Sequence, residues 1–95
     1  MSESTTILID RLLQKFNAGD AAAKTGLIEV AKDRLLILTS RILSGYPRGR
    51  QHDDTEGIFN ESYLRLHTAL DEVKPQSVRQ FMGLAALEIR RTLLD

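Results

Sequence analysis

Residues 55–70 have the sequence TEGIFNESYLRLHTAL, and the spacing of the apolar residues in this stretch decides the fold. Four of its apolar side chains, Phe59, Tyr63, Leu66 and Leu70, fall on one face of a helix. They recur three or four positions apart, which is the repeat of an α-helix with one buried face. The polar side chains Glu56, Asn60, Glu61 and Arg65 fall away from that face. We therefore predict a helix over residues 55–70, capped by Asp53, Asp54 or Thr55, with a core face and an outward polar face.

Three other segments carry the same periodicity, so helices are predicted over about residues 6–17, 21–44 and 77–95. The expected core residues are Ile9, Leu12, Leu13 and Phe16 in the first, Leu27, Val30, Ala31, Leu35, Leu38 and Ile42 in the second, and Val78, Phe81, Met82, Ala85, Ile89 and Leu93 in the last. No segment has the alternating pattern of a strand. The fold class predicted is all-α, a small four-helix bundle-like domain.

Local signals fix the ends of these helices. Gly19 suits the left-handed position that follows a helix, and Asp20 is a good N-cap for the next one. Pro75 ends the third helix and Ser77 is the expected N-cap of the fourth. Gly26, inside the second helix, indicates either close packing against another helix or a local break.

The fourth helix carries a second apolar line, Leu84, Leu87 and Leu94, in addition to its core face. One helix of a four-helix domain rarely buries two stripes. The sequence thus predicts that this helix packs between two neighbours or that residues 1–95 are a fragment of a longer protein.

Composition restricts the class of protein. Ninety-five residues without Cys form one small domain with neither disulfides nor thiolate metal ligands, which favours a reducing compartment. The polar, acidic N-terminus is unlike a signal peptide, and no apolar run approaches the ~20 residues that cross a bilayer. We expect a cytoplasmic protein that does not enter a membrane.

The charge pattern favours two partners. The net charge is zero, but the charged residues of 34–51 are all basic and those of 53–61 are all acidic. They are Arg34, Arg41, Arg48 and Arg50, followed by Asp53, Asp54, Glu56 and Glu61. One domain of this kind offers surfaces of opposite sign.

Nothing in the sequence is typical of an enzyme. The histidines, His52 and His67, lack the spacing of a metal site, and the adjacent carboxylates Asp53 and Asp54 are better explained as helix caps than as an acid–base pair. The glycines are scattered and form no phosphate-binding loop. We expect no catalytic residue, no metal and no cofactor.

Residues 54–66, DTEGIFNESYLRL, resemble the signature helix of region 2.2 of sigma factors. Residues 17–23 resemble the G-D-x-x-A segment of the same family, and residues 74–95 resemble the helix of regions 2.3 and 2.4. In that last helix Leu84 replaces the usual Trp and Arg91 the usual Asn. The variant is similar to divergent extracytoplasmic-function sigma factors of planctomycete-like bacteria, with the region 4 helix-turn-helix lying outside this chain.

The resemblance implies a non-enzymatic domain for transcription initiation that binds core RNA polymerase and recognises and melts the promoter −10 element. Its polymerase contact, to the coiled coil of the largest subunit, is expected at Asp54, Glu56, Asn60, Glu61 and Arg65. Contacts to promoter DNA, mainly its non-template strand, are expected at Lys74, Arg79, Arg90 and Arg91, and at Arg48 and Arg50 in the basic loop. An anti-sigma factor is a further implied partner.

The alternative is a helical protein–protein adaptor that kept the bundle and lost DNA binding. Its support is that Gly57 stands where the family usually has Asp, and Asn60 where it has Gln.

Overall fold

The chain folds into four helices, which confirms the predicted all-α class. The computed structural model describes residues 3–46 and 55–95, and the helices are α1 (Glu3–Asn17), α2 (Ala22–Ser44), α3 (Thr55–Val73) and α4 (Val78–Leu94). All four were predicted; α1 begins before residue 6, and α3 continues past residue 70. The described ranges contain no strand.

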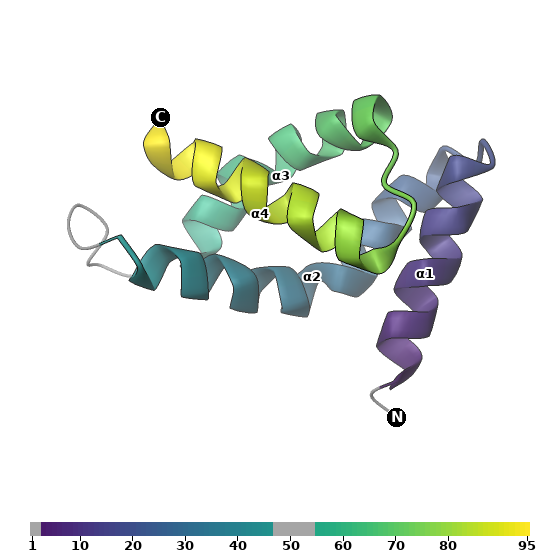
Figure 1. Ribbon diagram of the computed structural model, residues 1–95, viewed down its shortest axis with the longest axis horizontal. Helices are drawn as coiled ribbons and strands as arrows, with labels where there is room; N and C mark the ends of the chain where they lie inside the picture. The colour runs from purple at the N-terminus through teal and green to yellow at the C-terminus, as the bar shows by residue number, and fades with distance from the viewer. Residues whose placement is uncertain (1–2, 47–54) are drawn as a thin grey trace.

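The arrangement of the helices divides the molecule into two ends (Figure 1). Helices α2 and α4 pack against each other and run in the same direction, while α3 packs on both and runs in the opposite direction. Helix α1 crosses one end at a steep angle, beside the loop that joins α3 to α4. The C-terminal ends of α2 and α4 therefore meet at the other end.

Two apolar clusters fill the interior. The larger takes side chains from all four helices, namely Ile9, Leu13, Phe16, Ala23, Leu27, Ile28, Ala31, Leu35, Phe59, Leu66, Ala69, Leu70, Phe81, Leu84 and Ala85. The smaller lies where α2 and α4 end, and consists of Ile42, Leu43, Ile58, Ile89 and Leu93. Six residues predicted as core are only half-buried at the edges of these clusters, namely Leu12, Val30, Leu38, Tyr63, Val78 and Met82.

Gly19 and Ser77 act as predicted, whereas the N-cap of α2 is Ala21 and not the predicted Asp20. Gly19 has a φ of +108°, which L-residues with side chains rarely adopt, and Asp20 Oδ1 accepts a hydrogen bond from the Ala22 N–H at 3.1 Å. Ser77 is the N-cap of α4, its hydroxyl oxygen accepting from the Gln80 N–H at 3.1 Å. These local bonds orient α2 and α4 relative to the segments that precede them.

Two open questions from the sequence are resolved. Helix α2 is continuous through Gly26, and a Cβ there would lie 3.7 Å from Leu12 Cδ2 of α1, so the glycine marks packing and not a break. Leu84 of the second apolar line is buried because α4 packs against α2 and α3 together, which agrees with the first of the two alternatives for that residue. Leu87 and Leu94 are exposed at 43% and 74%.

None of the helices in residues 3–46 and 55–95 is long and apolar enough to span a membrane.

Candidate functional site

Helix α3 presents an outward face with an apolar centre. Leu64 is 70% exposed, and Asn60, Glu61 and Thr68, one helical turn or less from it, are exposed as well. The opposite side of the helix is anchored in the core by Phe59, Leu66 and Leu70. We call Asn60, Glu61, Leu64 and Thr68 the outward face of α3.

Four of the residues expected to contact polymerase are exposed on α3, namely Glu56, Asn60, Glu61 and Arg65. Arg65 differs from the rest, because its guanidinium pairs with the carboxylate of Asp95 at the end of α4. It therefore lies toward α4, away from the centre of the outward face. Asp54 lies outside the described residues.

Leu64 and Thr68 belong to this surface but were not among the residues predicted from the sequence. A signal was present, since Leu64 is a large apolar residue that falls outside the stripe of Phe59, Leu66 and Leu70. Apolar side chains surrounded by polar ones are typical anchors of protein–protein interfaces.

The α3–α4 loop, residues 74–77, is fixed from two sides. Lys74 leaves α3 with a φ of 52°, and the carbonyl oxygen of the buried Pro75 accepts a hydrogen bond from Asn17 Nδ2 of α1 at 2.8 Å. The Gln76 N–H donates to Gln80 Oε1 at 2.8 Å. These two hydrogen bonds hold the short loop in one conformation between α3 and α4.

The basic residues expected at DNA fall into two groups along α4. Lys74 and Arg79 lie at its start, where Lys74 Nζ sits 4.6 Å from the centroid of the Phe16 ring. Arg90 and Arg91 lie about 16 Å farther along, at 1.5 Å per residue. Arg48 and Arg50 lie outside the described residues.

Adjacent arginines on α4 have different surroundings. Arg91 Nη1 lies 3.0 Å from Glu88 Oε2, and the Glu88 side chain is only 6% exposed. Arg91 therefore neutralises a buried carboxylate, a role that competes with contact to DNA. Arg90 is exposed and makes no ion pair within the part of the chain that the structure describes.

No metal-binding cluster of His, Cys, Asp or Glu occurs in residues 3–46 and 55–95. The described histidine, His67, has its ring tilted by 41° against that of Tyr63, with centroids 5.8 Å apart, and its carbonyl oxygen accepts a hydrogen bond from Lys24 Nζ at 3.2 Å. The ring contact lies within α3, whereas the backbone hydrogen bond joins α3 to α2.

The described residues thus form a small all-helical domain, in which α3 has an exposed face around Leu64 and α4 carries exposed arginines. Residues 7–95 match the family described as ECF sigma factor, and the chain belongs to this family. ECF sigma factors are a family of transcription regulators and not of enzymes. Comparison with curated proteins and with solved structures finds no significant match.

Proposed function

We propose that this domain is a promoter-specificity subunit that binds core RNA polymerase through the outward face of α3. It then captures and melts the promoter −10 element with the α3–α4 loop and the basic residues of α4. These partners place its action in the cytoplasm, with an anti-sigma factor as a further partner.

The observation that carries the polymerase contact is the exposure of Leu64 among polar neighbours on a helix whose other side is anchored in the core. Burying one leucine side chain in an interface contributes about 1.5–3 kcal/mol, which makes Leu64 the expected energetic centre. The polar side chains of Asn60 and Glu61 lie beside it. They determine how the two surfaces are oriented when they bind.

The DNA contact is supported by the chemistry of Arg79 and Arg90. Both are exposed, and neither has an ion-pair partner among the described residues. A planar guanidinium can bind a phosphate or stack on an unpaired base, and both groups become available as a duplex opens. Arg91 has a smaller part in this proposal because Glu88 engages it.

The polymerase contact is tested by co-purification of the chain with core RNA polymerase. Glu61→Lys should reduce the amount retained, whereas Asp33→Lys, which reverses an exposed carboxylate on α2, should not. Equal retention of the two variants would show that the outward face of α3 does not bind polymerase. No retention of the folded, unaltered chain would refute polymerase binding.

Promoter opening is tested by permanganate reactivity of unpaired thymines when core polymerase and the chain are mixed with candidate promoters. Arg79→Gln with Arg90→Gln should lower the reactivity while leaving polymerase binding intact. Polymerase binding without opening on any promoter would instead support a protein–protein adaptor.

A further inference from the structure

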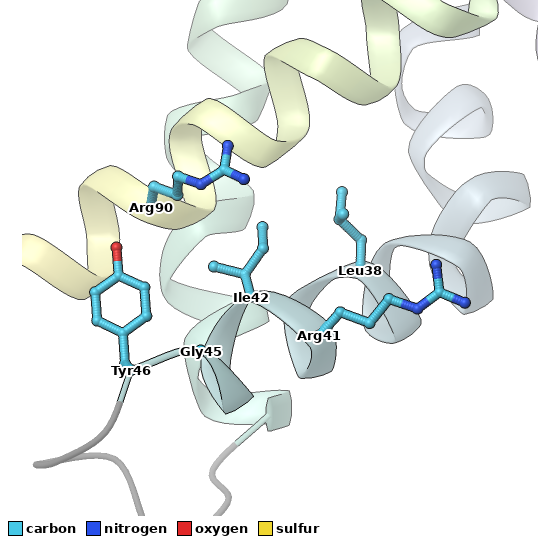
Figure 2. A pocket seen from close by; sticks show the side chains of 6 residues that line it. All are labelled: Leu38, Arg41, Ile42, Gly45, Tyr46 and Arg90. Atoms are coloured by element: carbon cyan, nitrogen blue, oxygen red, sulfur yellow. The ribbon is translucent and has the colours of Figure 1, made fainter.

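A pocket separate from the outward face of α3 and from the α3–α4 loop lies between α2 and α4, near their C-terminal ends (Figure 2). Its volume is about 390 Å³, within the range of small-molecule sites. The described residues that line it are Leu38, Arg41, Ile42, Gly45, Tyr46 and Arg90. Arg90 comes from α4, and the other five belong to α2 or directly follow it.

The floor of the pocket is a hydrocarbon surface with very few hydrogen-bonding groups. Ile42 belongs to the smaller core cluster, and Leu38 and Tyr46 pack against that cluster. In Figure 2 the Leu38 and Ile42 side chains point from α2 toward α4, and the Tyr46 ring stands beyond them. Among the side chains of the described lining residues, the Tyr46 hydroxyl is the one neutral polar group. Because a buried polar group needs a hydrogen-bond partner, this floor suits a ligand whose body is an alkyl chain.

The rim of the pocket is cationic. Arg41 and Arg90 approach it from different helices, and none of the described lining residues is acidic. Neither arginine forms an ion pair within the part of the chain that the structure describes, in contrast to Arg65 and Arg91. A guanidinium group donates two parallel hydrogen bonds to a carboxylate, so the rim suits a ligand with a carboxylate head group.

We propose that this pocket binds a medium-chain fatty acid, with its carboxylate on Arg41 and Arg90 and its alkyl chain on the floor. One molecule of this class satisfies both parts of the pocket, whereas a small inorganic anion would leave the floor in contact with water. Arg90 is also one of the residues expected at promoter DNA, so a bound fatty acid would compete with the DNA strand and lower promoter opening. Only this regulatory consequence rests on the proposed function.

Binding is tested by titrating the ¹⁵N-labelled chain with hexanoate, octanoate and decanoate, followed by NMR. Saturable shifts are expected at the backbone amides of residues 41, 46 and 90. Affinity should rise by about threefold for each added methylene group, because each group moves from water onto the apolar floor. Acetate supplies the head group alone, octanol the chain without a charge, and octylammonium the chain with the opposite charge. All three should bind at least tenfold more weakly than octanoate.

Two substitutions separate the contribution of the head group from that of the chain. Arg41→Gln should weaken octanoate binding at least fivefold and leave octanol binding unchanged, whereas Leu38→Ala should weaken both. The matched control, Arg11→Gln, removes one arginine from an exposed position on α1 and should change neither. Circular dichroism checks that each variant keeps its helices.

The site is overturned if saturable shifts at residues 41, 46 and 90 are absent. Weakening by Arg11→Gln equal to that by Arg41→Gln, or octylammonium binding as tight as that of octanoate, would also overturn it.

The regulatory consequence has its own measurement. Saturating octanoate should lower the permanganate reactivity of promoter thymines with the unaltered chain and leave its retention by core polymerase unchanged. Unchanged reactivity at saturation would refute competition with DNA. The NMR titration needs neither polymerase nor promoter, so failure of the fatty-acid site and failure of the proposed function are distinguishable.

Discussion

Lys24 Nζ lies 2.7 Å from Asp71 Oδ2, so one ammonium group joins the start of α2 to the last turns of α3. The Lys24 side chain is only 11% exposed, whereas that of Asp71 is 57% exposed. The hydrogen bond from Lys24 lowers the pKa of Asp71 from its ordinary value of 3.8. The pair therefore ties together two segments 47 residues apart.

Asp71→Asn should lower stability at neutral pH. Because the folded-state pKa of Asp71 is below 3.8, the stabilisation is fully present above that pH and is lost as the pH falls through the lower, folded-state value. Urea unfolding from pH 7 to pH 2 should show the variant and the parent converging in acid. Asp33→Asn, at an exposed position of α2, is the control; a difference for Asp71→Asn that does not change with pH would contradict this account.

Gly26→Ala should stabilise the chain by about 1 kcal/mol, the helix propensity difference, because α2 is helical there and the added methyl meets Leu12 at an ordinary contact distance of 3.7 Å. Gly19→Ala should destabilise it by about 1–2 kcal/mol, since φ is +108°. Thermal unfolding of both variants checks the pair. The two substitutions should change the unfolding temperature in opposite directions. A lower unfolding temperature for Gly26→Ala would mean that α1 cannot accommodate the added methyl group.

Arg91→Gln should destabilise the fold, whereas Arg90→Gln should not, although the residues are neighbours. Removing Arg91 leaves the buried carboxylate of Glu88 without its partner; the cost is about 1 kcal/mol because the arginine itself is largely exposed. A double-mutant cycle with Glu88→Gln, measured by urea unfolding, isolates the pair. Additive effects of the two substitutions would show that the ion pair contributes nothing.

Phe81→Ala should cost about 3–5 kcal/mol of stability, because the ring is fully buried in the larger core cluster. Because the ring is 0% exposed, it cannot serve as a platform for an unpaired base in this conformation. Chemical unfolding of Phe81→Ala and Phe81→Leu measures the loss, which should be smaller for leucine. A stable Phe81→Ala variant with weakened DNA binding would reverse this assignment.

The helices were predictable because their signals are local. Gly19, Asp20, Pro75 and Ser77 act on neighbouring backbone groups, so the predicted boundaries fall within a few residues of those observed. The extension of α3 to Val73 was missed because the pairing of Asp71 with Lys24 depends on how α2 and α3 pack. The spacing of apolar residues along the chain does not predict an ion pair between two helices.

The candidate site was predictable only in outline. The outward position of Asn60 and Glu61 followed from helical spacing, but the engagement of Arg65 by Asp95, 30 residues away, required the packing of α3 on α4. In the same way, Arg41 of α2 and Arg90 of α4 line one pocket because α2 and α4 pack together, which helical spacing does not reveal. The sequence shows which side chains are charged, but which of them lie close together depends on how the helices pack.

The most direct measurement of the central claim is a titration of the fluorescently labelled chain with core RNA polymerase, comparing Leu64→Asp with Ile37→Asp. Leu64 on α3 is 70% exposed, and Ile37 on α2 is 54% exposed. Each substitution therefore adds the same charge at an accessible apolar position. We predict saturable binding of the unaltered chain, at least tenfold weaker binding of Leu64→Asp, and unchanged binding of Ile37→Asp. Equal effects of the two substitutions, or no binding by the folded parent chain, would contradict the account.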